Sequence, residues 1–222
     1  MKSLKTILNV NLIKTLYFNF HYFPVKIAIK LPVFIYWKTD LFKMGGSIQL
    51  ENIRTGMVKL GPHYLGIKDY MYSRTMWDVS GKVIFCGRAN IGRGSKVSCG
   101  KEGTITFGED FTSTANMEIV CNKDISFGND CLLAWDVLIM DSDLHNIKDE
   151  KGVVINPSKP VSFGNHVWIG CRNTILKGVS IASNTIISAN STITKSISDS
   201  YCIIGGNGKT TEVLKRNVNW EH

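Results

Sequence analysis

The sequence lacks a Cys-x-x-Cys pair, and no histidine stands at the spacing of a zinc finger. It also lacks a helix-turn-helix or an aromatic ribonucleoprotein motif, so no motif assigns its net charge of +8 to nucleic acid. That charge suits an anionic ligand or an anionic membrane face equally well. We expect reduced packing thiols of a cytosolic protein at the six cysteine positions, which are 86, 99, 121, 131, 171 and 202.

Long apolar runs are missing as well. Residues 11–37 are apolar, aromatic and basic, but lysines, one histidine and two prolines interrupt them every few residues. No stretch therefore approaches the ~20 apolar residues of a membrane-spanning helix, and no small-residue cleavage site marks a signal peptide. We expect residues 1–60 to be an N-terminal extension that caps the main domain. Peripheral contact of this segment with the inner face of the cell membrane is the alternative.

What the sequence does contain is a period of six residues. Aliphatic or aromatic residues recur without a break at Phe163, Ile169, Ile175, Ile181, Ile187 and Ile193. Interrupted blocks with the same period comprise Phe85, Ile91 and Val97, then Phe107, Ser113, Ile119 and Ile125, then Phe127, Leu133 and Ile139. Neither a heptad repeat nor an amphipathic helix has this period, so the pattern indicates a short structural repeat.

The third position after most of these residues is glycine, asparagine or aspartate, the residues that enter the left-handed backbone region at low cost. The positions are Gly94, Gly100, Asp110, Asn116, Asn122, Asp130, Asp136, Gly178, Asn184 and Asn190. One inward side chain and one sharp corner in every repeat predict short strands wound into stacked coils, in which each backbone group finds a partner in the next coil.

From about Val83 to Asn207 this pattern resembles the hexapeptide-repeat acyltransferases, and among them the sugar and polysaccharide O-acetyltransferases. The resemblance implies an all-β solenoid, a left-handed parallel β-helix with triangular coils, and homotrimers with active sites between subunits. We expect the β-helix over residues 61–205, an ejected active-site loop over 141–160 and a short C-terminal helical tail over 206–222.

The repeat stops between Met140 and Pro160, and His145 lies in this interruption. Transfer of an acyl group from a thioester needs a base for the attacking group, and an imidazole suits that task. The segment DSDLHNI resembles the family's catalytic histidine segment, which implies that His145 is the base. Asp141 or Asp143 is the candidate to hold the tautomer of its ring, as an acid does in other base-assisted acyl transfers. A solvated loop histidine is the alternative. The other histidines are predicted to be structural or on the surface, namely His21, His63, His166 and His222.

Three residues are assigned to the acceptor: Asn116, Asp143 and Trp168. Asn116, in NMEIV, resembles the acceptor-orienting asparagine of the family, and a turn residue in the left-handed region is its alternative. Trp168, in VWIG, matches a tryptophan that related enzymes place near the acceptor pocket, where it would shield the site from water. Its alternative is ordinary packing at a subunit interface.

In similar enzymes coenzyme A lies in the groove between adjacent solenoids, along the backbone of the later coils. The matching positions here are Gly170, Cys171, Ala189, Thr194 and Lys195, with Lys209 as a further candidate for a coenzyme phosphate. The family's closing Gly-Asn-Pro-Ala-Lys-like turn is replaced by Gly206, Asn207, Gly208 and Lys209. The proline is missing and the basic residue is displaced by one position, which bears on the phosphate contact more than on the fold.

The sequence therefore predicts a metal-independent enzyme that moves an acetyl group from acetyl-coenzyme A to a hydroxyl of a sugar or polysaccharide precursor, in a ternary complex. N-acetylation of an amino sugar or another small amine, and a non-catalytic β-helix scaffold, remain as alternatives. A zinc hydratase resembling γ-class carbonic anhydrase would need three histidine ligands, and His145 and His166 have no third partner at suitable spacing.

Overall fold

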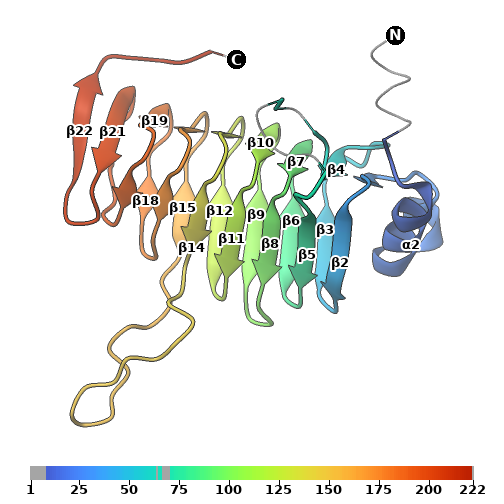
Figure 1. Cartoon of the computed structure of the whole chain (residues 1–222), viewed down its shortest axis with the longest axis horizontal. Coiled ribbons are helices and arrows are strands. Elements are labelled where there is room, and N and C mark those ends of the chain that lie inside the picture. Colours follow the sequence, from blue (N-terminus) through green and yellow to red (C-terminus); the bar gives the residue numbers. More distant parts are fainter. Residues whose placement is uncertain (1–8, 64, 67–70, 222) are drawn as a thin grey trace.

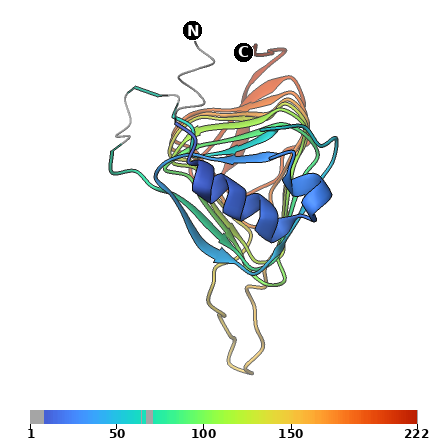
Figure 2. The ribbon, with the colours of Figure 1, turned by 90° about the vertical axis from the view of Figure 1, so that its right-hand side faces the viewer.

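The computed structural model describes residues 9–63, 65–66 and 71–221. Its strands wind into a left-handed parallel β-helix whose three sheets form the sides of a triangular solenoid (Figures 1 and 2). Each strand pairs in parallel with the strand one coil away, as Ile119 does with Val97 on one side and Ile139 on the other. The backbone groups of the inner coils are therefore satisfied between coils, as the repeat predicts.

The first sheet contains β1 (Val33–Ile35), β4 (Val58–Leu60), β7 (Ala89–Arg93), β10 (Phe111–Ala115), β13 (Leu132–Leu133), β16 (Trp168–Ile169), β19 (Thr185–Ile187), β21 (Cys202–Gly206) and β22 (Thr211–Arg216). The second contains β2 (Thr39–Met44), β5 (Thr75–Val79), β8 (Lys96–Cys99), β11 (Glu118–Cys121), β14 (Leu138–Met140), β17 (Thr174–Ile175) and β20 (Thr192–Ile193). The third contains β3 (Ser47–Leu50), β6 (Lys82–Phe85), β9 (Thr104–Phe107), β12 (Asp124–Phe127), β15 (Val161–Phe163) and β18 (Ser180–Ile181). We call the turn from the first sheet to the second the first corner, and the turn from the second sheet to the third the second corner.

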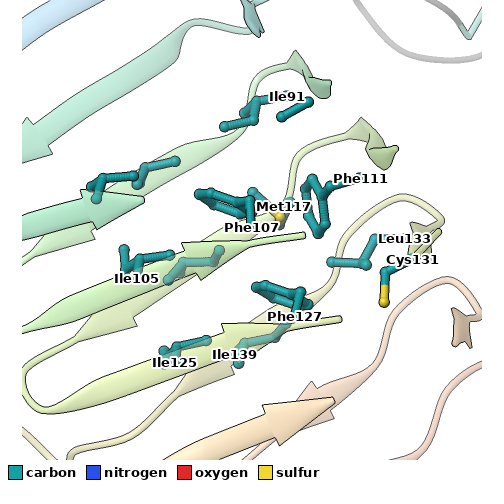
Figure 3. Packing of buried hydrophobic residues seen from close by; sticks show 14 of the residues in the cluster. Ile91, Ile105, Phe107, Phe111, Met117, Ile125, Phe127, Cys131, Leu133 and Ile139 are labelled. Carbon is teal, nitrogen blue, oxygen red and sulfur yellow. The ribbon is translucent and has the colours of Figure 1, made fainter. Parts of the chain in front are cut away.

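The residues of the six-residue period fill the interior. Every position of the repeat from Phe85 to Ile193 is buried, and the side chains stack in columns along the solenoid axis. In the third sheet Phe107 lies between Phe85 and Phe127, with ring centroids 5.1 and 5.6 Å apart, and Phe127 stacks on Phe163 at 4.9 Å. Figure 3 shows Phe107 and Phe127 one above the other in successive coils. Burial of these columns is the main stabilising contribution to the fold.

Most of the corner residues adopt the left-handed backbone that the sequence predicts. Positive φ angles occur at Gly94, Asp110, Asn116, Asp130, Asp136, Gly178, Asn184 and Asn190. The prediction is wrong at Gly100 and Asn122. Both lie at the second corner, where a turn over Lys101–Gly103 replaces the sharp bend in one coil and the backbone N–H groups of residues 122–124 converge on Asp141 in the next.

The coils begin earlier than residue 61, the start that we expected. Strands β1 to β3 form a complete coil that pairs in parallel with β4 to β6, with one shift of register between β2 and β5. The six-residue period does not reveal this coil, because its turns differ in length from those of the later coils. Helices α2 (Leu12–Tyr22) and α3 (Val25–Ala28) precede it, and α2 lies across the open end of the triangle (Figure 2).

Helix α2 closes the edge of the first sheet with two polar side chains. Asn19 donates to the carbonyl of Val33 (2.7 Å) and accepts from its N–H (3.1 Å), and the hydroxyl of Thr15 accepts from Ile35 N–H (3.0 Å). The buried ring of Phe18 meets Trp77 edge to face, with centroids 5.6 Å apart. The edge strand β1 is therefore covered and its backbone groups are paired. Among the described residues, no helix has the length and apolar character needed to cross a membrane.

The C-terminal end differs from the expected helical tail. A turn at Asn207 and Gly208, with φ of +84° at the glycine, reverses the chain into β22, which pairs antiparallel with β21. The strand sequence, TEVLKR, carries β-branched residues and covers the edge that β21 would otherwise expose. Pairing with this open edge prevails over the helix that the family resemblance implied.

Candidate active site

The interruption of the repeat is a hairpin-like loop that projects from the second corner between β14 and β15 (Figures 1 and 2). Lys148 and Val154 form an antiparallel bridge within it, and Ile155 N–H donates to Ile147 O at 2.9 Å. At the tip the Asp149 carboxylate accepts from the N–H groups of residues 151 and 153, both at 2.9 Å. These contacts give the loop an ordered shape although it stands away from the coils.

Asn156 and Lys177 brace the base of this loop. The Asn156 amide donates to Asp143 Oδ2 (2.7 Å) and to the carbonyl of His145 (2.8 Å), and its oxygen accepts from Ile147 N–H (2.6 Å). Lys177, at the second corner of the following coil, donates to the Asp143 carboxylate and to Asn156 O. The hydrogen bonds from Lys177 and Asn156 hold the pKa of Asp143 below its usual value, because they favour the ionised carboxylate.

His145, the predicted base, is exposed on this braced segment. Its backbone is fixed through the carbonyl that Asn156 binds, and its ring makes no hydrogen bond or ion pair within the described part of the chain. An exposed imidazole on a rigid backbone can accept a proton from a group that approaches from outside the chain.

The two aspartates proposed to orient the ring have other partners. Asp141 is fully buried, and its carboxylate accepts from the N–H groups of Asn122 (2.8 Å), Lys123 (2.7 Å) and Asp124 (2.8 Å). Asp143 is engaged by Lys177 and Asn156. Asp141 therefore fixes the second corner and Asp143 fixes the loop base, and within one chain neither carboxylate is bound to the ring of His145.

A cavity of about 660 Å³ opens along the first corner, on the opposite edge of the second sheet from the loop. Asn116 lines it in the left-handed conformation (φ +50°) and donates from Nδ2 to Asp136 Oδ1 at 3.0 Å. Its wall carries both signs of charge, with Arg74 beside Asp40 at 3.4 Å and Lys96 paired with Glu118. The described lining residues are Asp40, Tyr72, Ser73, Arg74, Met76, Gly94, Lys96, Asn116, Glu118, Asp136, Val137 and Leu138, and none of them belongs to the loop.

The residues assigned to the acceptor thus do not meet within one chain. Asn116 lies in the cavity, Asp143 at the base of the loop, and Trp168 on the outer face of the first sheet. There Trp168 is 37% exposed and faces Trp220, with ring centroids 6.1 Å apart. Asn116, which was assigned to the acceptor from the sequence, lines the cavity, but the cavity's charged residues were not predicted in that way, because they come from separate coils and share no sequence motif.

The positions matched to coenzyme A fall into two groups. Gly170, Cys171 and Ala189 lie at the first corner of successive coils, along the same edge as the cavity, where Gly170 N–H donates to Ile187 O at 2.9 Å. A side chain at Gly170 would meet backbone atoms of the next coil at 2.8 Å, so close stacking of the coils requires glycine there.

Thr194, Lys195 and Lys209 form the second group, at the C-terminal end of the solenoid. Thr194 Oγ1 donates to Gly208 O at 3.1 Å, which places it beside the turn that carries Lys209. Both lysines are exposed. Lys195 follows β20 and Lys209 lies in the turn between β21 and β22, and each ammonium group can contact a phosphate.

The remaining histidines have structural surroundings where they are described. His166 stands at a corner with φ of +56°, beside Asp130 at 2.6 Å, and His21 contacts Met44 O at 2.7 Å. His222 lies outside the described residues. All six cysteines are free thiols, four of them buried. Within residues 9–63, 65–66 and 71–221 no three His, Cys, Asp or Glu side chains are grouped to hold a metal ion.

Comparison with known proteins identifies relatives of the solenoid. Residues 160–195 match the model of the bacterial transferase hexapeptide family, described as six repeats. These residues carry the hexapeptide repeat of that family. The structure of the polySia-specific acetyltransferase NeuO superposes on it with a TM-score of 0.55 and 25% identity, over 85% of this chain and 78% of that one.

Two curated relatives of the chain are named O-acetyltransferases. It is 35% identical over 130 residues to polysialic acid O-acetyltransferase from Escherichia coli O1:K1, which covers 58% of this chain and 39% of that relative. It is 33% identical over 95 residues to galactoside O-acetyltransferase from Escherichia coli K12, covering 42% and 46%. The chain thus matches less than half the length of either relative.

Proposed function

We propose that this chain transfers an acetyl group from acetyl-coenzyme A to a hydroxyl of a sugar or polysaccharide precursor. One observation carries the proposal. The longest connection between successive strands is the loop over residues 141–160, and that loop presents His145 on a backbone fixed by Asn156. The relatives' names, polysialic acid and galactoside O-acetyltransferase, support a carbohydrate hydroxyl as the acceptor.

His145 acts as the general base in a ternary complex. Its unprotonated ring nitrogen takes the proton of the acceptor hydroxyl while the oxygen attacks the thioester carbonyl carbon. Backbone N–H groups of a coil stabilise the oxyanion. Collapse of this intermediate breaks the carbon–sulfur bond, and the thiolate leaves with the proton that the imidazolium returns. No cysteine takes part, which agrees with the burial of four of the six thiols.

The cavity at the first corner is the proposed acceptor site. Asn116, Asp136 and Glu118 offer amide and carboxylate groups that hydrogen-bond to sugar hydroxyls, while Arg74 and Lys96 offer cations for a carboxylate or phosphate on the acceptor. Coenzyme A is assigned to the same edge, along Gly170, Cys171 and Ala189, with Thr194, Lys195 and Lys209 for its phosphates. Donor and acceptor would then meet along one edge of the solenoid.

The active site is completed by a second copy of the chain in a homotrimer. The cavity lies at the first corner and His145 beyond the second, so one chain does not bring the base to its own cavity. The loop also exposes large apolar side chains, which a neighbouring solenoid would cover, at Leu144, Ile147, Val153 and Ile155. In the trimer His145 of each subunit would serve the cavity of its neighbour, and Trp168 would wall this shared site.

The first test is release of free coenzyme A from acetyl-coenzyme A with a panel of sugars, nucleotide sugars and amino sugars. We expect release with a hydroxyl acceptor, reduced by two or more orders of magnitude in His145→Ala, the usual size of a general-base contribution. Equal release by both proteins would remove His145 from the mechanism. Release with amine acceptors alone would replace O-acetylation by N-acetylation, and absence of both release and coenzyme binding would favour a scaffold.

Mixing two inactive variants tests the shared site. His145→Ala retains an intact cavity, and Asn116→Ala retains an intact base. After joint refolding, mixed trimers contain interfaces in which both residues are native, so we expect part of the activity to return. Persistent inactivity of mixed oligomers would place the base and the cavity of one catalytic unit in the same chain.

A further inference from the structure

Helix α2 has one buried face and, opposite it, an exposed apolar face. One face packs on the first coil through Thr15, Phe18 and Asn19, which are all buried. The other face points away from the solenoid, as Figure 2 shows for the helix that crosses its end. It presents large apolar side chains to solvent at Leu12, Ile13, Leu16, Tyr17 and Phe20, with Ile13 80% exposed.

The exposed apolar surface continues onto α3 and the residues that follow it. Val25 is 66% and Ile29 64% exposed, and Ala28 between them is buried against the core. Lys26 and Lys30 are exposed one residue after each of these apolar side chains. We call the surface formed by residues 12, 13, 16, 17, 20, 25, 26, 29 and 30 the end face.

The end face has charge of one sign only. The sequence carries six lysines and no aspartate or glutamate before Asp40. A contiguous exposed apolar patch on a protein surface normally marks a contact site. Apolar side chains interleaved with lysines, on a helix lying in the plane of the end, are the arrangement by which proteins bind the surface of an anionic bilayer.

We propose that the end face docks on an anionic lipid surface, with the apolar side chains entering the headgroup region and Lys26 and Lys30 contacting lipid phosphates. A second copy of the chain fits less well, because end-to-end contact would bring the lysines of two copies together. The proposal is independent of catalysis, since none of these residues lies in the loop or the cavity.

Docking fixes the orientation of the solenoid. The end face closes the first coil, so the solenoid axis would stand away from the lipid surface (Figure 2). The cavity starts at Asp40 in that first coil and reaches Leu138 in the fifth. With strands stacked at about 4.8 Å and helix α2, about 10 Å across, between the first coil and the lipid, the cavity would lie within about 30 Å of the lipid. Under the proposed function, this placement suits acceptors held at a membrane surface.

Vesicle flotation with the full chain tests the proposal. Vesicles of phosphatidylcholine alone are compared with vesicles of phosphatidylcholine and phosphatidylglycerol in equal parts. We expect binding to the anionic vesicles and little to the neutral ones. Ile13→Gln should lower the partition coefficient about tenfold, since it removes one large aliphatic side chain that the lipid would bury. Lys26→Gln should lower it about fivefold, the usual contribution of one lysine at an anionic surface.

Matched variants outside the end face are the controls. Leu214→Gln changes a 55% exposed leucine on β22, and Lys101→Gln changes an exposed lysine at a corner turn. Both should bind vesicles as the unmodified chain does. Circular dichroism and thermal unfolding of all four variants establish that the fold is retained, which the exposure of the four side chains favours.

Three outcomes would overturn the proposal. The first is absence of binding to the anionic vesicles. The second is loss of binding in Lys26→Gln and Lys101→Gln alike with none in Ile13→Gln, which indicates diffuse charge adsorption without insertion. The third is self-association in the absence of lipid that Ile13→Gln abolishes, which would assign the end face to a second copy of the chain.

Discussion

The ring of Trp220 stacks on the imidazole of His166, with centroids 4.2 Å apart and planes inclined by 7°. The contact is reinforced in both directions, because Trp220 Nε1 donates to His166 O and His166 Nε2 lies beside Trp220 O, each at 3.1 Å. The C-terminal segment is thereby fastened to a corner three coils away from the strand it follows. The C-terminal segment lies beside Trp168. We expect this surface to contact a neighbouring subunit.

Replacing Trp220 by alanine should destabilise the C-terminal end of the solenoid. The side chain is 6% exposed, and its loss removes buried area, a stacked pair and a hydrogen bond. We expect a loss of about 3 kcal/mol in the free energy of unfolding, measured by chemical denaturation. Trp220→Phe keeps the ring and loses the Nε1 donor, so it should cost only about 1 kcal/mol. Equal stability of Trp220→Ala and the unmodified chain would contradict this role.

Asp141 and Asp143 should respond differently to the same substitution. Asp141→Asn replaces a buried acceptor of three backbone N–H groups by an amide that can offer only one oxygen to them. We expect a loss of about 3 kcal/mol, measured by thermal and chemical unfolding. Asp143→Asn alters an exposed ion pair with Lys177 and should change stability by less than about 1 kcal/mol. Similar losses in both variants would show that the buried hydrogen bonds of Asp141 stabilise the fold no more than the exposed ion pair of Asp143 does.

Asn156 is predicted to position His145 without touching the substrate. Its side chain holds the carbonyl of His145 and the N–H of Ile147, so Asn156→Ala should loosen the base relative to the acceptor. We expect kcat to fall roughly tenfold or more with KM little changed. The double variant Asn156→Ala/His145→Ala should be no slower than His145→Ala alone. Additive losses would indicate a role for Asn156 that does not pass through His145.

Cys131 should resist alkylation in the folded protein. Burial raises the pKa of its thiol to about 12, because the ionised form would lose its hydration. Iodoacetamide at mildly alkaline pH should label the half-buried Cys86 and Cys171 before Cys131, as peptide mass spectrometry would report, and Cys131 should react once denaturant is added.

The same shift of Cys131 has a consequence for stability. The unfolded thiol ionises near pH 8.5 and the folded one only near 12, so between these values the folded state binds more protons. Its contribution to stability is complete below about pH 8.5 and declines as the pH rises through this window. Cys131→Ala should reduce the slope of stability against pH there, and an unchanged slope would contradict the assignment.

Spacing in the sequence predicts only part of the candidate site. The break in the period located the loop and His145, and the resemblance of NMEIV to a family segment singled out Asn116. The partners of Asp141, the brace formed by Asn156 and Lys177, and the cavity wall of Arg74, Lys96 and Glu118 were not predictable in this way. These contacts join residues of different coils, and their distance along the sequence depends on the lengths of the turns between them.

The sequence by itself determined the solenoid, because a side chain that returns every sixth residue to one interior column, with a left-handed corner after it, is compatible with little else. Tertiary structure decided the two ends. The first coil has irregular turns and is recognised only through its pairing with the second, and the C-terminal residues formed a strand where a helix was expected. At each end the open sheet edge governs the outcome, since unpaired backbone groups are satisfied by whichever segment can reach them.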